Sequence, residues 1–304
     1  MIIGHKITKS FQGKKILDEV SFRIDPGQIT ALIGINGSGK TTLLKIIAGI
    51  LDVDKGYVRV NGKEPQAVRK DSEEVIAFMS SRYSNLTGAE TVKDAIDMCR
   101  KMYNVPNSYY EYFKEYVEKR LGLDELWRKE CGTLSAGEKA RVEFFYNLLM
   151  RPTLWLMDEP TLGVDYETRL RMYEILKHIK SRNTEMTVIV ATHNLQEMEI
   201  LCDKVLVLQG GKMVFSGPLH YLRQIYQTLG IISFEVMEGN VAFQDMPINW
   251  YHIEGNRVKL MFDKHYVSAA TVLKCVMESV RLQNLSVTDV DMESMIKRIF
   301  QTEE

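Results

Sequence analysis

The order of apolar and polar residues changes along the N-terminal part of the chain. Apolar and polar residues alternate over residues 20–24, which predicts a strand with one buried face, and Asp-Pro-Gly at residues 25–27 predicts the turn that ends it. An apolar run at residues 29–33 predicts a second, fully buried strand, and leucines and isoleucines over residues 43–47 predict a helix that stops at Gly49. A strand, a glycine-rich loop and a helix therefore follow one another.

Two further apolar runs predict buried strands in the middle of the chain. Residues 154–157 and residues 187–191 show no alternation, which is typical of strands in a parallel sheet that helices cover on both faces. Between roughly residues 83 and 146 the pattern is helical. One apolar helix face there is expected to comprise Tyr109, Phe113, Tyr116, Val117 and Leu121.

The last part of the chain reads as a separate small unit. Alternation at residues 232–236 and 258–262 predicts two strands, and apolar positions over residues 269–280 predict a helix face. A strand near residues 285–290 and a short helix at residues 292–300 are expected after it.

Composition limits the classes of function. The chain has 304 residues, 45% of them hydrophobic, and a net charge of −1 at pH 7, so it lacks the basic excess that neutralises nucleic-acid phosphates, and nucleic acid is not expected as a partner. No run approaches the roughly 18 apolar residues needed to cross a bilayer, and no signal peptide is expected. We therefore expect a soluble protein that reaches a membrane only through a partner. The cysteines show no Cys-x-x-Cys spacing and are expected to be reduced core thiols.

Gly-Ile-Asn-Gly-Ser-Gly-Lys-Thr at residues 34–41, here called the phosphate loop, joins the second strand to the helix. Its glycines let the backbone turn N–H groups toward a polyphosphate, and the helix adds its positive end. Lys40 is expected to reach the β and γ phosphates and Thr41 to ligate Mg²⁺. The nucleoside triphosphate is expected to contact Gly34, Ile35, Asn36, Gly37, Ser38, Gly39, Lys40, Thr41 and Thr42.

Polar residues end the two central strands. Asp158 is expected to hold Mg²⁺ through water, and Glu159 to orient and polarise the attacking water. His193 follows the strand at residues 187–191. Because ligands of open α/β sheets bind beyond the carboxyl ends of the strands, His193 is expected to hydrogen-bond the γ phosphate.

These motifs, together with Leu-Ser-Ala-Gly-Glu at residues 134–138 (the signature segment) and Gly-Val-Asp at residues 163–165 (the GVD turn), resemble those of ATP-binding cassette (ABC) transporter ATPases in kind, order and spacing. The resemblance covers about the first 220 residues. It implies a P-loop NTPase core with an N-terminal antiparallel β subdomain and an inserted α-helical subdomain. We expect this α/β core to span residues 1–222 and a small α+β accessory domain to span residues 223–304.

The family implies that two subunits enclose two ATP molecules head to tail. Phe11 would stack on adenine, Asp165 would couple the two sites, and His193 would contact the γ phosphate. The partner's ATP would be closed in by the signature segment, Leu134, Ser135, Ala136, Gly137 and Glu138.

Two positions depart from the family pattern. Family members usually carry a glutamine after a strand roughly forty residues beyond the phosphate-loop lysine, where it touches Mg²⁺ and senses the membrane partner. The aligned position here is Ser81, whose hydroxyl reaches less far. Glu138 stands where glutamine is commoner, and it adds negative charge near a phosphate site.

The resemblance implies a Mg²⁺-dependent ATP hydrolase at the cytoplasmic face of the cell membrane, bound to integral membrane permease subunits and paired with a second ABC ATPase subunit, with a weak preference for a homodimer. Residues 289–300 are similar to the tail of subunits that serve exporters of drugs, peptides or polysaccharides, so we expect export. Two alternatives stay open. One is a regulatory subunit that binds ATP with weak or no hydrolysis, and the other is a soluble ABC ATPase without a transport role.

Overall fold

The computed structural model describes residues 1–69, 74–81, 84–86, 91–193, 199–239 and 246–290. The chain divides into two compact units, Met1–Gly217 and Pro218–Glu304. The expected boundary after residue 222 falls inside helix α8 (Leu219–Gln227), which belongs to the second unit. None of the described helices is long and apolar enough to cross a membrane.

An antiparallel sheet of three strands forms the N-terminal subdomain, in the order β2-β1-β4. Its strands are β1 (Ile2–Phe11), β2 (Lys14–Ile24) and β4 (Lys55–Val60). The alternation that predicts β2 is confirmed, because Val20, Phe22 and Ile24 are buried while Ser21 and Arg23 are exposed.

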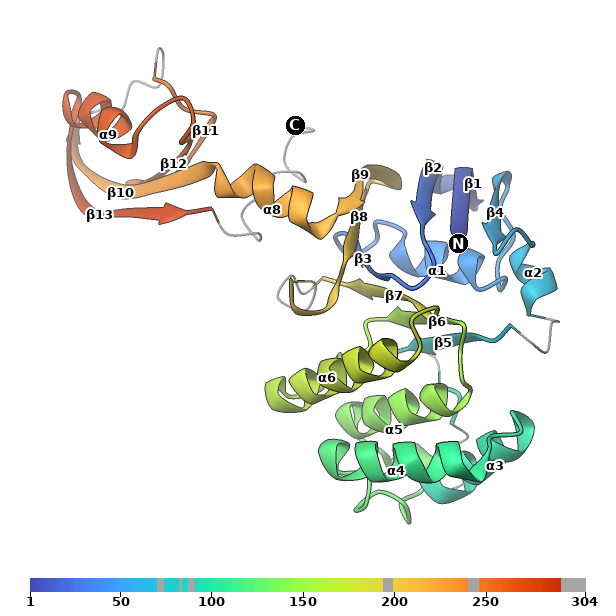
Figure 1. Cartoon of the computed structure of the whole chain (residues 1–304). Coiled ribbons are helices and arrows are strands. Elements are labelled where there is room, and N and C mark those ends of the chain that lie inside the picture. Colours follow the sequence, from blue (N-terminus) through green and yellow to red (C-terminus); the bar gives the residue numbers. More distant parts are fainter. Residues whose placement is uncertain (70–73, 82–83, 87–90, 194–198, 240–245, 291–304) are drawn as a thin grey trace. The chain divides into compact units, whose positions relative to one another are not determined.

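A six-stranded sheet forms the centre of the first unit, in the order β5-β6-β7-β3-β8-β9, and the strands from β5 to β8 in this order are parallel to one another. Its strands are β3 (Ile29–Ile33), β5 (Ile76–Ser80), β6 (Leu154–Asp158), β7 (Thr187–Thr192), β8 (Lys204–Gln209) and β9 (Lys212–Pro218). Helix α1 (Lys40–Ile47) lies between this sheet and the N-terminal sheet (Figure 1). Its Leu43 and Leu44 share one hydrophobic core with Leu156 of β6.

The other face of the central sheet is covered by helices. Helices α5 (Ala136–Leu149) and α6 (Tyr166–Arg182) lie against it, and helices α3 (Val92–Met102) and α4 (Asn107–Leu121) pack on these two helices. A short α2 (Pro65–Val68) precedes β5. Phe144 of α5 packs on Trp155 of β6, with ring centroids 5.0 Å apart. Since Trp155 faces α5 and Leu156 faces α1, β6 is buried on both faces, which explains its unbroken apolar run.

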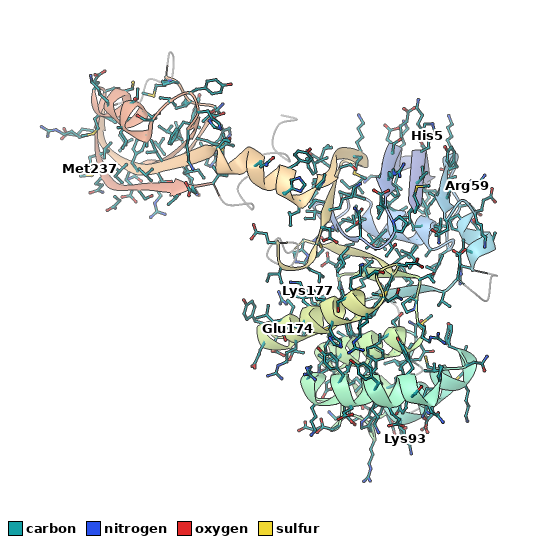
Figure 2. The ribbon with its side chains drawn as sticks, viewed as in Figure 1. His5, Arg59, Lys93, Glu174, Lys177 and Met237 are labelled. Carbon is teal, nitrogen blue, oxygen red and sulfur yellow. The ribbon has the colours of Figure 1, made fainter. Side chains whose placement is uncertain are left out.

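The helix faces follow the apolar periodicity only in part. On α4 the buried residues are Tyr110, Phe113, Val117 and Leu121, so the expected stripe is shifted at its N-terminal end, where Tyr110 rather than Tyr109 is buried. On α6, Glu174 and Lys177 point away from the core, as Figure 2 shows.

The second unit contains an antiparallel sheet in the order β11-β12-β10-β13 with helix α9 (Ala269–Met277) packed on it. Its strands are β10 (Leu229–Gly239), β11 (Trp250–Glu254), β12 (Arg257–Asp263) and β13 (Val280–Asp289). The expected helix face is too long, because Val280 already begins β13, and β11 was not expected. The expected helix at residues 292–300 lies outside the described residues.

The four cysteines are free thiols, as expected. Three of them are buried, namely Cys99, Cys131 and Cys202, and Cys275 is partly buried.

Candidate active site

The phosphate loop connects β3 to α1 along a path that only glycine can follow. Gly39 precedes α1 with a φ of 106°, in the left-handed region that favours glycine, and no side chain caps the helix. A Cβ atom on Gly34 would lie 2.3 Å from the Leu208 carbonyl oxygen and 2.3 Å from Ser38 Oγ. The first N–H groups of α1 are therefore without a side-chain acceptor, which is the condition for binding an anion.

Lys40 is folded back over this loop. Its Nζ donates to the Gly34 carbonyl oxygen at 2.7 Å and to the Ile35 carbonyl oxygen at 3.3 Å. Burial lowers the pKa of Lys40, and the charges of Glu159 and Asp158 act in the opposite direction. The ammonium group therefore closes the loop on itself and lies in the field of both carboxylates.

Thr41 and Asp158 come together at the carboxyl end of β6. Thr41 Oγ1 donates to Asp158 Oδ2 at 2.8 Å, and Asp158 is buried. A hydroxyl and a carboxylate oxygen side by side are the hard donors that Mg²⁺ prefers, so these two residues fit the ion expected there.

Ser81 lies on the neighbouring strand end. Its backbone N–H donates to the Asp158 carbonyl oxygen at 3.2 Å, and β5 pairs with β6 in register at Ser80 and Asp158. The side chain of Ser81 is exposed. The structure thus places Ser81 beside Asp158 through the backbone.

Glu159 and His193 form a second pair at the same edge of the sheet. Glu159 has a φ of 51°, which is uncommon for a residue other than glycine, and its N–H donates to the Ala191 carbonyl oxygen at 2.9 Å. This turn brings the Glu159 carboxylate to 2.9 Å from His193 Nδ1. The adjacent strands β6 and β7 therefore bring together two residues that are far apart in sequence.

The signature segment begins α5. Ser135 Oγ accepts from the Glu138 N–H at 3.3 Å, and a Glu138 carboxylate oxygen accepts from the Ser135 N–H at 2.9 Å, so the two residues form a capping box. Lys129 Nζ donates to the Glu138 carboxylate at 2.7 Å. This hydrogen bond, followed by the one from the Ser135 N–H, lowers the pKa of Glu138 to about 2. The extra negative charge at this position is thus held by Lys129 within the same chain.

The GVD turn packs against the signature segment of the same chain. A Cβ atom on Gly137 would lie 2.7 Å from the Gly163 carbonyl oxygen, and Gly163 has a φ of 79°. Asp165 caps α6 by accepting from the Thr168 N–H at 2.9 Å. This hydrogen bond lowers the pKa of Asp165. The contact between the two motifs was not predicted from the sequence, although each motif contains a glycine, which permits two backbone segments to approach closely.

The remaining candidate residues stay apart. Within the described chain, no hydrogen bond joins residues 134–138 to residues 34–42. Phe11 ends β1 and is 44% exposed, and Lys9 Nζ lies 5.6 Å from the centroid of its ring. The expected adenine contact therefore depends on a solvent-facing ring.

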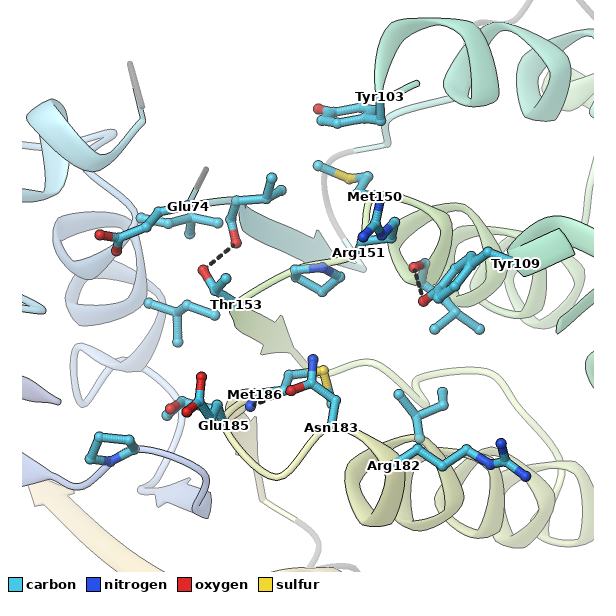
Figure 3. Close-up of a pocket in the computed structure, with 18 of the residues that line it drawn as sticks. Glu74, Tyr103, Tyr109, Met150, Arg151, Thr153, Arg182, Asn183, Glu185 and Met186 are labelled. Atoms are coloured by element: carbon cyan, nitrogen blue, oxygen red, sulfur yellow. Dashed lines mark hydrogen bonds between the residues drawn. The ribbon is translucent and has the colours of Figure 1, made fainter. Parts of the chain in front are cut away.

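A groove of about 1740 Å³ lies at the opposite ends of the strands. Its lining includes the starts of β5, β6 and β7 and, from the helices, Tyr103, Tyr109 and Arg182 (Figure 3). The sequence-predicted nucleotide residues do not line it, because they follow the carboxyl ends of these strands.

The chain is similar to several known proteins. The family model described as ABC transporter matches residues 17–162. The chain is 34% identical over 220 residues to an uncharacterized ABC transporter ATP-binding protein of Methanocaldococcus jannaschii, covering 70% of this chain and 76% of that protein. It is 30% identical to the zinc uptake system ATP-binding protein ZurA of Listeria innocua, covering 71% of this chain and 85% of that protein. A dimeric structure of a post-hydrolysis state of the ATP-binding cassette MJ0796 bound to ADP and Pi matches with a TM-score of 0.64 at 22% identity, covering 72% of this chain and 99% of that chain.

Proposed function

Because the chain belongs to the family of ABC transporter ATP-binding proteins, we propose that it is the ATP-binding and ATP-hydrolysing subunit of an exporter. One observation carries the proposal. Thr41 and Asp158, 2.8 Å apart, and Glu159 and His193, 2.9 Å apart, meet at one edge of the central sheet beside the uncapped start of α1. This arrangement supports phosphoryl transfer to water.

In the proposed reaction, the backbone of the phosphate loop and Lys40 bind the β and γ phosphates. Thr41 and Asp158 hold Mg²⁺, which when bound neutralises charge on the phosphates. Ser81 is a further ligand candidate, supported by its backbone contact with Asp158. Glu159 accepts a proton from water at its carboxylate, and His193 orients that carboxylate through Nδ1 before contacting the γ phosphate.

The second half of each site is proposed to come from another cassette. Ser135 and Ala136 at the start of α5 are exposed, and the Ser135 hydroxyl can donate to a phosphate bound by a partner subunit. Asp165, held at the start of α6 next to the signature segment, would couple the two sites. Phe11 would stack on adenine through its exposed ring.

We place the protein at the cytoplasmic face of the cell membrane through permease subunits. Two exposed methionines on α3, Met98 and Met102, support a docking surface on the helical subdomain. Met102→Glu should lower copurification with the permease and leave ATP affinity unchanged, and Lys93→Glu, on the same helix, is the control. Two residues close to Ser81 in the sequence are less suitable for this test, because Tyr83 lies outside the described residues and Leu86 is buried.

Export is the proposed direction, supported by the similarity of residues 289–300 to tails of export subunits. These residues belong to the second unit, which we propose as an accessory domain. Because the similar protein ZurA belongs to a zinc uptake system, the decisive measurement is the direction of ATP-driven cargo movement in vesicles that contain the complex.

Steady-state phosphate release tests the catalytic assignment and separates it from an ATP-binding regulatory subunit. Glu159→Gln should keep ATP binding, abolish turnover and trap a dimer, because the amide cannot accept the proton. Glu174→Gln makes the same change at an exposed position of α6 and should leave hydrolysis unchanged. Normal hydrolysis by Glu159→Gln would overturn the assignment, and so would intact ATP binding by Lys40→Ala.

A further inference from the structure

Glu143 is a buried acidic residue in the middle of α5. It is 2% exposed, and the residues beside it on the helix, Val142 and Phe144, belong to the hydrophobic core. A buried carboxylate is costly unless donors surround it, so its partners indicate what the position does.

The donors come from the segment after β5. The N–H of Asn85 donates to Glu143 Oε1 at 2.7 Å, the Ser84 hydroxyl donates to the same oxygen, and Asn85 Nδ2 lies 3.3 Å from Oε2. Ser84 Oγ also accepts from the Leu86 N–H at 3.1 Å. Residues 84–86 therefore form a turn whose polar groups converge on one carboxylate.

A second set of contacts belongs to α5 itself. Asn147, one turn further on and fully buried, donates from Nδ2 to the Glu143 carbonyl oxygen at 2.8 Å and lies 3.3 Å from its Oε2. These contacts of Asn147 are with Glu143 and not with residues 84–86, so Asn147→Ala removes a buried donor from the same carboxylate and leaves the donors of residues 84–86 in place.

Glu143 lies between two parts of the candidate active site. Ser81, three residues before Ser84, donates from its N–H to the carbonyl oxygen of Asp158. Ser135 begins α5 eight residues before Glu143, which is about 12 Å along the helix. The carboxylate thus joins residues 84–86, after β5, to the helix that carries the signature segment.

We propose that Glu143 is a positioning residue that couples residues 84–86 to α5, so that a force on this segment moves Ser135. The inference rests on the proposed function, because it assigns a coupling role within the ATP-hydrolysing dimer. Without the carboxylate, α5 is held less firmly to the end of β5, and the signature segment is less often in the position that closes on a partner's ATP. ATP bound to the phosphate loop of the same chain does not require this contact.

The test uses the full-length chain and three readouts. These are ATP affinity by nucleotide fluorescence, kcat for phosphate release, and the ATP concentration that drives dimerisation in the Glu159→Gln background. For Glu143→Gln we expect an ATP Kd within about twofold of wild type, a kcat about tenfold lower, and an ATP concentration for dimerisation about tenfold higher, in the range of typical coupling energies. Ser84→Ala removes one donor from residues 84–86 and should also lower kcat and raise the ATP concentration for dimerisation. It replaces Glu143→Gln as the test variant if Glu143→Gln does not fold.

Three results separate coupling from a general structural role. Asn147→Ala should lower the melting temperature without changing the ATP concentration for dimerisation. The double variant Ser84→Ala with Glu143→Gln should lose less than the sum of the two single losses, since both changes weaken the same hydrogen bond between Ser84 and Glu143. Wild-type kcat and dimerisation in Glu143→Gln, or additive losses in the double variant, would overturn the inference. Failure of the wild-type chain to dimerise with ATP or hydrolyse it would instead overturn the proposed function, and the inference with it.

Discussion

The contact between the signature segment and the GVD turn makes Gly137→Ala an informative substitution. The new Cβ would lie 2.7 Å from the Gly163 carbonyl oxygen, whereas ordinary contacts begin at 3.4 Å, so one backbone segment must move by about 0.7 Å. The obstacle is a carbonyl oxygen in a turn held by hydrogen bonds from Leu162 to Glu159 and from Val164 to Thr161. A flexible side chain cannot move aside here to relieve the overlap.

The expected cost is a balance of two effects. Alanine stabilises a helix by up to about 1 kcal/mol relative to glycine. Overpacking against a fixed backbone costs about 1–3 kcal/mol. We therefore expect a net destabilisation of about 1–2 kcal/mol, which would lower the melting temperature of the unit that contains Gly137 by a few degrees. Because the turn begins at Glu159, we also expect kcat to fall by about tenfold to a hundredfold with ATP affinity unchanged.

Thermal unfolding and steady-state phosphate release measure the two consequences. Lys139→Ala, two residues further along α5, removes side-chain atoms from the same helix without adding any toward Gly163, and should keep wild-type kcat. A Gly137→Ala protein with a melting temperature at or above wild type and with full activity would refute the reasoning, since it would mean that the turn yields without cost.

Three further predictions concern single side chains. The pKa of Glu138 is lowered to about 2, so the stability that its contacts provide is present above the ordinary glutamate pKa and is lost as the pH falls from that value toward 2. In acid unfolding curves, Glu138→Gln should therefore lose less stability over this pH range than wild type. An unchanged curve would contradict this prediction. Burial, followed by the charges of Arg182 and Arg120, lowers the pKa of His178, which favours the neutral ring that accepts from Arg182 at 3.2 Å. Stability should therefore fall as pH drops below the ordinary histidine pKa, and thermal melts of His178→Gln at pH 7.5 and 5.5 should differ less than those of wild type. Ser135→Ala should lose hydrolysis and ATP-driven dimerisation while monomer ATP affinity stays within about twofold, since its hydroxyl is proposed to serve a partner's site; a large loss of that affinity would show that Ser135 acts in its own chain.

Much of the central fold is predictable from local patterns. The alternation in residues 20–24 and the apolar runs at 29–33, 154–157 and 187–191 each correspond to a strand. Burial on one face gives an alternation in the sequence, and burial on both faces gives an unbroken apolar run. The second unit was less predictable. Strand β11 carries exposed Tyr251 and Ile253, and an edge strand with such side chains has no clear apolar period.

The motifs by themselves determine the chemistry that the chain can offer. A glycine loop ending in Lys40 and Thr41 and a strand ending in Asp158 and Glu159 indicate a nucleotide site, since backbone N–H groups, a cation and carboxylates are what a Mg²⁺-bound triphosphate requires. Local sequence is sufficient here because each motif is a short continuous segment whose conformation depends on its own glycines and strand ends.

Contacts between distant segments were decided only by the tertiary structure. The direct pairing of Glu159 with His193, the packing of Gly137 on Gly163, the ion pair that holds Glu138, and the connection of Glu143 to residues 84–86 each join elements that meet only after the sheet and helices have packed. Glu143 shows the reason most clearly. In the sequence it is one acidic residue on a helix, with nothing to mark it as buried, and its role follows from the donors that β5 and α5 bring within hydrogen-bonding distance.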